Sequence, residues 1–136
     1  AMRSELRPVE GRLVLADYYN ANPGSVTAAL ETLVSLRSGK AAVAVLGDML
    51  ELGEKSASEH FGLGEYLSAS GVDYVIAFGN FGRAVLEGAG SKTHGFYAGS
   101  HEEAAGTVKE IARPGDLVLV KGSRGMRMEE VTKRLV

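Results

Sequence analysis

Three apolar runs constrain the fold of this chain more than any other feature of its sequence. They span residues 41–46 (AAVAVL), 72–78 (VDYVIAF) and 117–120 (LVLV). Since polar residues do not alternate regularly with apolar ones along them, each run is typical of a strand that is covered on both faces. Helical patterns lie between the runs, and this alternation predicts a mostly parallel sheet with helices on both faces.

Weaker patterns add strands to the predicted sheet. Residues 13–16 (LVLA) form a further buried run, and residues 95–97 (GFY) predict a weak strand. Residues 3–9 are expected to form a short edge strand, because Pro8 has no N–H to donate to a central ladder. The predicted fold is therefore α/β with three layers: a mostly parallel, Rossmann-like sheet with helices on both faces and a short edge strand at the N-terminus. Residues 1–136 are expected to form a single domain.

Capping residues mark the starts of the predicted helices. Asn22 followed by Pro23 predicts an N-cap and the first helical position, where the missing proline N–H has no cost. Residues 56–59 and 100–103 both match the Ser-x-x-Glu capping box. In the helix after the first box, three side chains are expected to face the core: Phe61, Leu63 and Leu67.

The charge balance and the lack of cysteine narrow the class of protein. The sequence has 15 Lys and Arg against 17 Asp and Glu, a net charge of −2. This balance argues against a nucleic-acid or anionic-membrane partner, because both require a basic surplus. With no cysteine, the chain has no disulfide framework, thiolate metal site or cysteine nucleophile. The apolar runs are too short to span a bilayer and no signal peptide is visible, so a cytoplasmic location is expected.

Polar and charged residues follow four of the predicted strands, in segments 17–23, 47–53, 79–82 and 121–125. Because the carboxyl ends of parallel strands meet at one edge of a sheet, where ligands bind, we expect these segments to converge. Their carboxylates, amides and cations suit a polar, zwitterionic ligand. The candidate binding residues are Asp17, Tyr19, Asn20, Asn22, Asp48, Asn80, Lys121, Ser123 and Arg124.

Structural explanations compete with a functional one for some of these residues. Helix capping alone accounts for Asn22. For Asp48, ligand contact and hydrogen bonding to neighbouring loop amides remain equally open. The segment 121–125 (KGSRG) is harder to explain structurally, because its two glycines would let the backbone approach a ligand and its guanidinium can bind a carboxylate with two hydrogen bonds.

Several familiar motifs for catalysis and nucleotide binding are missing. Gly39-Lys40 lacks the upstream glycine of a phosphate-binding P-loop, and residues 62–64 (GLG) lie inside a predicted helix rather than after a strand. The three histidines, at 60, 94 and 101, are scattered, so we expect them to be solvated or hydrogen-bonded and predict no metal site. The residues alone therefore predict a ligand-binding α/β domain without its own nucleotide-activating machinery.

Three segments carry a resemblance to a known family. They are residues 17–25 (DYYNANPGS), 46–53 (LGDMLELG) and 115–126 (GDLVLVKGSRGM). In order and spacing they resemble the C-terminal domain of the Mur ligases, over essentially the whole chain. Within that family, the first segment favours the branch that adds D-alanyl-D-alanine to UDP-N-acetylmuramoyl-tripeptide in peptidoglycan synthesis.

The resemblance implies one domain of a three-domain enzyme. Its partners would be an N-terminal domain for the UDP-linked peptide and a central ATPase domain, which would hold most of the ATP and Mg²⁺. ATP would convert the tripeptide carboxylate to an acyl phosphate, which the amine of D-alanyl-D-alanine attacks. No catalytic residue, and no general base, is expected in this domain, which is predicted to be inactive alone.

The resemblance also divides the candidate residues between two ligands. The nucleotide-facing residues would be Asp17, near the ribose, with Tyr19, Asn20 and Asn22. The residues that face the dipeptide would be Asp48, Asn80, Lys121, Ser123 and Arg124. Tyr18 occupies a position where the family more often has a small residue, and it either packs within the domain or stacks near the adenine.

Two other classes of function are compatible with the sequence. One is the C-terminal domain of a sister Mur ligase or of a folylpolyglutamate synthase-type ligase. The other is a free-standing ligand-binding module of flavodoxin-like shape. Each interpretation that places a ligand at the strand ends requires the four polar segments to meet at one edge of the sheet.

Overall fold

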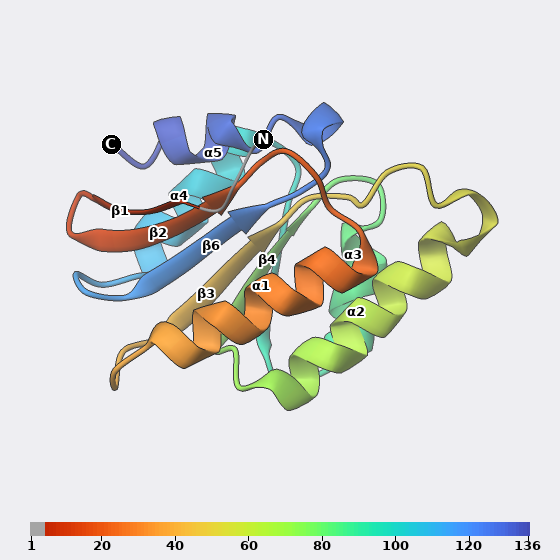
Figure 1. Cartoon of the computed structure of the whole chain (residues 1–136), viewed down its shortest axis with the longest axis horizontal. Helices are drawn as coiled ribbons and strands as arrows, with labels where there is room; N and C mark the ends of the chain where they lie inside the picture. The colour runs from red at the N-terminus through yellow and green to blue at the C-terminus, as the bar shows by residue number, and fades with distance from the viewer. Residues whose placement is uncertain (1–4) are drawn as a thin grey trace.

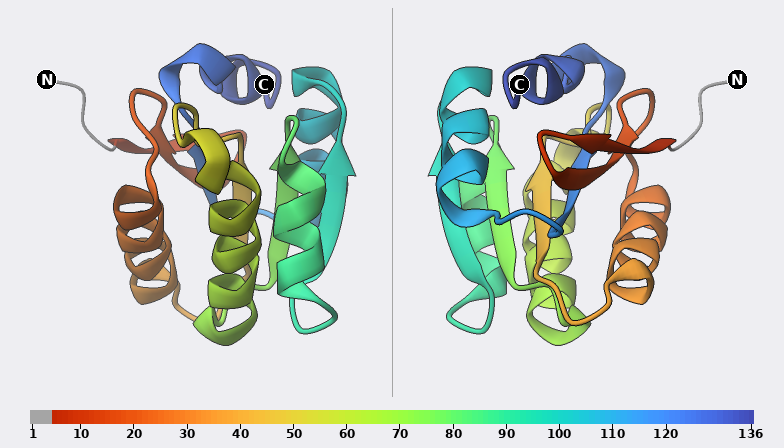
Figure 2. Two further views of the ribbon diagram at one scale, coloured as in Figure 1. Left: turned by 90° about the vertical axis from the view of Figure 1, so that its right-hand side faces the viewer. Right: turned by 90° about the vertical axis from the view of Figure 1, so that its left-hand side faces the viewer.

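A six-stranded sheet lies between two layers of helices in the computed structural model, which describes residues 5–136 (Figures 1 and 2). The strand order is β1-β2-β6-β3-β4-β5, with β1 antiparallel to β2 and every other neighbouring pair parallel. The strands are β1 (Glu5–Val9), β2 (Arg12–Asp17), β3 (Ala42–Leu46), β4 (Tyr74–Phe78), β5 (His94–Ala98) and β6 (Leu117–Lys121). The helices are α1 (Pro23–Leu36), α2 (Ser56–Ser70), α3 (Gly82–Ala89), α4 (His101–Ile111) and α5 (Glu129–Lys133).

The predicted fold class is confirmed, including the mostly parallel sheet and the edge strand near the N-terminus. The first two residues of the strand predicted over 3–9 lie outside the described residues. Within residues 5–136, no helix combines the length and the apolar character that crossing a membrane requires.

Two separate cores form because the strands are apolar on both faces. Along β6, Leu117 and Leu119 join the core under α1, α2 and α3, whereas Val118 and Val120 join the core under α4 and α5. Successive side chains of a strand point to opposite faces, so an apolar run without alternation supplies both cores at once. This two-sided burial is the physical reason why residues 117–120 could be assigned to an inner strand from their sequence.

Strand β6 occupies a switch point in the chain's path. It lies between β2 and β3, which are joined by α1 on one face of the sheet. The helices next to β6 in sequence, α4 and α5, lie on the other face (Figure 2). In open α/β sheets a crevice forms at the carboxyl ends of strands whose connections leave in opposite directions. The loop after β6 is therefore at the position where such folds bind ligands.

The ends of the helices confirm two of the three predicted caps. Asn22 Oδ1 accepts a hydrogen bond from the Ser25 amide at 2.9 Å, with Pro23 as the first residue of α1. Ser100 Oγ likewise accepts from the Glu103 amide at 3.0 Å. The box predicted at residues 56–59 is wrong: a 3₁₀ turn (Gly53–Lys55) runs directly into α2, so Ser56 begins a helix that the preceding turn already extends.

The core-facing side of α2 differs from the prediction at one position. Leu63 and Leu67 are buried as expected, but Phe61 is 38% exposed. His60 is buried in its place, at 1% exposure. Residues 60, 63, 64 and 67 follow the three- and four-residue spacing of one helix face, and position 61 lies about 100° away from it. The helical phase therefore determines which side chain is buried, despite the greater hydrophobicity of phenylalanine.

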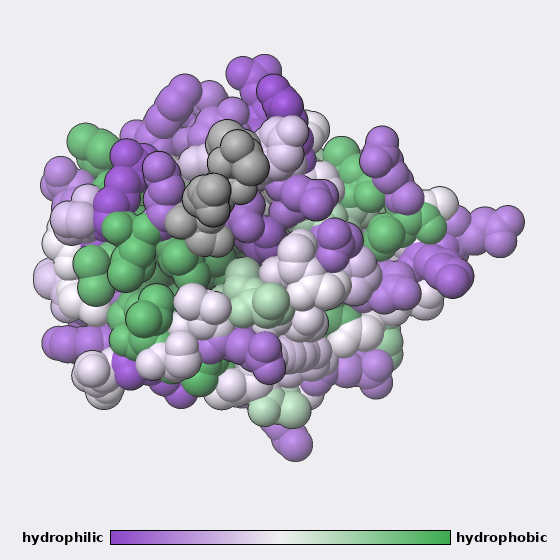
Figure 3. Space-filling model, viewed as in Figure 1, coloured by the Kyte–Doolittle hydropathy of each residue, from purple (hydrophilic) through white to green (hydrophobic). Residues whose placement is uncertain are grey.

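Part of the sheet is not covered by a helix on the side of α1. Helix α1 packs over β6 and β3, and an apolar area extends beyond it over the β1–β2 hairpin (Figure 3). Leu6, which pairs with Leu15, is 48% exposed there, and Leu13 is half-buried.

Helices α2 and α3 pack backbone to backbone through two glycines. A Cβ atom at Gly64 would overlap the Val85 carbonyl oxygen and lie 2.6 Å from the Ala89 nitrogen. A Cβ atom at Gly88 would overlap the carbonyl oxygen of Phe61. Gly64 of the 62–64 segment is thus explained by helix packing, and the segment lies inside α2 as the sequence predicted.

We predict that Gly64→Ala lowers the free energy of unfolding by about 1–3 kcal/mol or more, because backbone atoms of α3 cannot move aside as a side chain can. The matched control is Gly62→Ala on the same helix, where a Cβ atom would meet nothing within 4 Å. Alanine's helix propensity should make that variant more stable by up to about 1 kcal/mol. Urea unfolding of both variants is the measurement, and equal effects would show that the helices do not touch at Gly64.

Candidate ligand site at the carboxyl ends of the strands

The four polar segments lie together at the carboxyl ends of β2, β3, β4 and β6, and hydrogen bonds join them directly. We call this edge the strand-end rim: residues 17–23, 47–53, 79–82 and 121–127. Strand β6 lies next to both β2 and β3, so its loop contacts the loops on either side. Four of the nine side chains predicted for ligand binding make hydrogen bonds between segments at this edge: Asp17, Asp48, Lys121 and Ser123.

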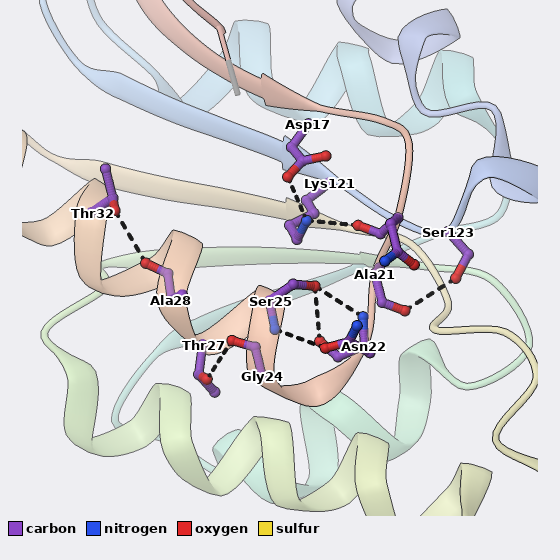
Figure 4. Close-up of polar contacts among 11 residues, drawn as sticks. Asp17, Ala21, Asn22, Gly24, Ser25, Thr27, Ala28, Thr32, Lys121 and Ser123 are labelled. Atoms are coloured by element: carbon purple, nitrogen blue, oxygen red, sulfur yellow. Dashed lines mark hydrogen bonds and ion pairs between the residues drawn. The ribbon is translucent and has the colours of Figure 1, made fainter. Parts of the chain in front are cut away.

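Lys121 is buried, and its amine is bound within the chain. The side chain is 1% exposed, and Nζ donates to Asp17 Oδ2 and to the Asn20 carbonyl oxygen, both at 2.7 Å (Figure 4). Asp17 and Lys121 are direct neighbours in the β2–β6 register, so both side chains point to the same face. The ion pair therefore holds the loop after β2 against β6. Asp17, with its side chain 22% exposed, still reaches the surface.

The Asp48 carboxylate is also hydrogen-bonded within the chain. Its carboxylate is buried and accepts from two backbone amides, Asn80 N at 2.9 Å and Phe81 N at 3.0 Å. A Cβ atom at Gly79, where φ is +117°, would lie 2.6 Å from the Asp48 carboxylate carbon. In this structure the Asp48 carboxylate makes the loop hydrogen bonds that were one of its two expected roles. The side chain of Asn80 is exposed at the rim.

Ser123 joins three loops through one hydroxyl and one amide. Its Oγ accepts from the Leu50 amide at 2.8 Å and donates to the Ala21 carbonyl oxygen at 3.3 Å. Its backbone N–H donates to the Asp48 carbonyl oxygen at 3.1 Å. Ser123 is buried, so this hydroxyl stabilises the rim from inside.

Close packing within the chain accounts for Gly122, the first of the two glycines around Ser123 and Arg124, where we had expected close approach of a ligand. A Cβ atom at Gly122 would lie 2.7 Å from Met128 Cγ and 3.2 Å from Gly47 Cα. One at Gly125 would lie 2.9 Å from Leu50 Cδ1. The loop after β6 is thus pressed against its neighbours, and a side chain at Gly122 would separate them.

A pocket of about 410 Å³ opens at the rim, lined by Tyr18, Tyr19, Arg124 and Glu129. The Arg124 guanidinium carbon lies 5.3 Å from the centre of the Tyr19 ring, within the range of a cation–π contact. Tyr18 also packs within the domain, because its hydroxyl hydrogen-bonds to Thr132 Oγ1 at 2.7 Å. Tyr19 and Arg124, which we had assigned to different ligands, therefore line one pocket.

Glu129 is the pocket residue that the sequence did not reveal. Two acids begin α5, and both are explained equally well by the helix dipole. The structure separates them. Hydrogen bonds from Arg134 and Lys133 lower the pKa of Glu130 to about 2, whereas no ion pair of Glu129 occurs within residues 5–136. Glu129 thus supplies a carboxylate to the pocket that contains the Arg124 cation.

The fold and the rim define a class of protein: an α/β domain with a pocket of aromatic and charged side chains at the carboxyl ends of parallel strands, where such folds bind ligands. A family model described as "Mur ligase, glutamate ligase domain" matches residues 2–124. The chain therefore belongs to the Mur ligase family.

Individual relatives carry a more specific name. The UDP-N-acetylmuramoyl-tripeptide–D-alanyl-D-alanine ligase of Bacillus subtilis is 37% identical over 139 residues, which cover 99% of this chain and 30% of the relative. The Escherichia coli ligase of the same name is 38% identical, over 93% of this chain and 27% of its own. The crystal structure of the MurF ligase from Thermotoga maritima in complex with ADP matches with a TM-score of 0.79 and 32% identity, covering 95% of this chain and 29% of that one. The chain thus spans less than a third of each relative.

We predict that Lys121→Met lowers the free energy of unfolding by about 3 kcal/mol or more, because it leaves the Asp17 carboxylate and the Asn20 carbonyl oxygen without their buried donor. The control is Lys133→Met, which removes an ion pair to Glu130 in which the lysine is 68% exposed. Such surface pairs contribute about 0–1 kcal/mol. Chemical unfolding measures both, and similar small losses would mean that the Lys121 ion pair does not hold the rim together.

Proposed function

We propose that this chain is the C-terminal domain of an ATP-dependent amide-bond ligase that adds D-alanyl-D-alanine to UDP-N-acetylmuramoyl-tripeptide in peptidoglycan synthesis. The observation that carries the proposal is the similarity, over nearly the whole chain, to relatives with that name. The rim pocket supports it independently, because a guanidinium and a carboxylate together complement a zwitterion such as a dipeptide.

The pocket is proposed to bind the incoming dipeptide. Arg124 would donate two hydrogen bonds to its carboxylate, and Glu129 would accept from its ammonium group before the amine loses a proton. Asn80, whose side chain is exposed on the neighbouring loop, would supply further hydrogen bonds. Holding the amine beside an activated carboxyl group lowers the barrier by positioning, which contributes roughly 7–11 kcal/mol in ideal intramolecular reactions.

Three of the residues predicted to face the dipeptide would affect the site indirectly, because they are buried beneath it. Asp48, Lys121 and Ser123 are buried and hydrogen-bonded to the chain, so we propose that they shape the rim that presents Arg124 and Asn80. Preorganised loops reduce the entropy that binding costs.

The end of β2 and the loop after it are proposed to face the nucleotide through Asp17, Tyr19, Asn20 and Asn22. The part-exposed Asp17 carboxylate fits a ribose hydroxyl, and the exposed Asn20 side chain can donate and accept. The Asn22 carboxamide oxygen is occupied by the α1 cap, which leaves its NH₂ group for a ligand. ATP supplies the phosphoryl group that activates the tripeptide carboxylate.

Other domains are proposed to supply the remaining machinery. The sequence has no P-loop, and no group of three or more potential metal-ligating side chains occurs in residues 5–136. We therefore propose that a central domain holds Mg²⁺ and the phosphates, and that an N-terminal domain holds the UDP-linked peptide. Closure over them would exclude water from the activated carboxyl group. An enzyme that consumes ATP works where ATP is supplied, and we propose the cytoplasm.

The proposed activity is tested with the full-length enzyme that contains this chain, assayed for phosphate release with UDP-N-acetylmuramoyl-tripeptide and a panel of amines. We expect D-alanyl-D-alanine to support turnover at least 100-fold better than single amino acids. This chain alone should release no phosphate. Turnover with glutamate or another single amino acid in preference to the dipeptide would assign the chain to a sister ligase. Tight ATP binding by this chain alone, measured by calorimetry, would favour a free-standing module.

In the full-length enzyme, Arg124→Ala is expected to raise the KM for D-alanyl-D-alanine roughly 10- to 150-fold, the equivalent of losing a charged hydrogen bond of about 1.5–3 kcal/mol. Arg124→Lys should recover only part of this, because an ammonium group cannot bind a carboxylate with two parallel bonds. The KM for ATP should not change. Steady-state kinetics with each substrate varied in turn is the measurement.

Two control variants make the Arg124 result specific. Arg113→Ala removes a guanidinium from the opposite end of the sheet, before β6, and should leave both KM values unchanged. Asn20→Ala retains the backbone carbonyl that binds Lys121, and should raise the KM for ATP alone. An Arg124→Ala enzyme with wild-type KM for the dipeptide would show that the pocket does not bind it.

A further inference from the structure

His60 is a buried polar side chain that the proposed mechanism does not use. It lies on α2 at 1% exposure, and its ring contacts two loops of the strand-end rim. Nε2 lies 3.0 Å from the Met49 amide nitrogen, and Nδ1 lies 2.6 Å from the Ser56 carbonyl oxygen one turn earlier in α2. The ring also stacks on Phe81, with centroids 4.8 Å apart and planes 20° from parallel.

These partners determine the protonation of the ring. A backbone N–H can only donate and a carbonyl oxygen can only accept, so Nε2 must carry a lone pair and Nδ1 must carry the hydrogen. His60 is therefore the neutral Nδ1–H tautomer. Protonation at Nε2 would place two N–H groups against each other at Met49.

The Met49 amide lies at the centre of the rim's hydrogen bonds. The residue before it, Asp48, anchors the loop after β4, and the residue after it, Leu50, is held by Ser123. His60 fixes the amide between them and packs against the ring of Phe81, whose own amide is bound to Asp48. One imidazole thus restrains both the 47–53 loop and the 79–82 loop.

We propose that His60, as its neutral Nδ1–H tautomer, is a positioning residue for the rim: it holds the loops after β3 and β4 in the conformation that binds the dipeptide. The identity of that ligand rests on the proposed function. The positioning itself rests on the contacts of this chain, and His60 touches no reacting group.

The test uses two variants of similar size. His60→Leu fills the space but cannot accept a hydrogen bond, whereas His60→Gln retains an acceptor that can reach the Met49 amide. In this chain, we expect ¹⁵N NMR to show the Nδ1–H tautomer. Amide hydrogen exchange at Met49 should become at least 10-fold faster in His60→Leu and stay near the wild-type rate in His60→Gln. His94→Leu, at an exposed position on β5, is the control and should leave Met49 unchanged.

The same variants in the full-length ligase test whether the loop position that His60 maintains affects binding of the dipeptide. We expect His60→Leu to raise the KM for D-alanyl-D-alanine at least 10-fold with little change in the KM for ATP, and His60→Gln to restore most of the loss. An Nε2–H tautomer in the wild-type chain, or a His60→Gln variant no better than His60→Leu, would overturn the proposal. If His60→Leu does not fold, the proposal is still tested by the tautomer of the wild-type ring and by the rate of amide exchange at Met49 in His60→Gln.

The two proposals fail in different ways. If the wild-type ligase shows no turnover with D-alanyl-D-alanine, the proposed function is wrong, and exchange at Met49 still decides whether His60 fixes the rim. If turnover is normal in wild type and in a folded His60→Leu variant, the function holds and the positioning role is wrong.

Discussion

The buried ammonium group of Lys121 is the constraint on which the arrangement of the strand ends depends. A charge that is 1% exposed costs several kcal/mol of lost hydration unless partners surround it. Its partners are the Asp17 carboxylate, at the end of β2, and the Asn20 carbonyl oxygen, in the loop that follows. The loop must therefore adopt the conformation in which Asn20 reaches Nζ. Two residues after Lys121, Ser123 hydrogen-bonds to the same loop at Ala21 and to the loop after β3 at Leu50.

Burial divides the polar residues of the rim into two groups with different physical roles. Buried groups such as the Asp48 carboxylate accept hydrogen bonds from backbone amides and make the loops rigid. The exposed Arg124 and the half-buried Glu129 instead line the pocket at the rim. The first group creates the shape that the second group uses, since flexible side chains bind well only when the backbone beneath them is fixed. The neutral ring of His60 belongs to the first group, although it lies on a helix behind the rim.

Much of the fold could be predicted because its causes are local. The apolar run at 117–120 needed only its composition to be assigned to an inner strand, and Asn22 needed only Pro23 beside it to be assigned as a cap. The two errors, both at α2, had different causes. A 3₁₀ turn made the Ser56 cap unnecessary, and the phase of α2 buried His60 instead of Phe61. The segments of the candidate site were predictable because each follows a strand of a parallel sheet, but the internal hydrogen bonds of Lys121 and Asp48 were not.

The amino-acid sequence by itself determined the strands, most helix starts, the family resemblance and the set of polar segments at one edge of the sheet, because each of these depends on residues that are close in the chain. Only the tertiary structure decided which polar groups are hydrogen-bonded within the chain and which line the open pocket. Lys121 and Asp17 are separated by 104 positions, and Ser123 and Leu50 by 73. Whether a charged or polar atom is left to solvent depends on such distant partners, and spacing along the chain contains no measure of their distance in space.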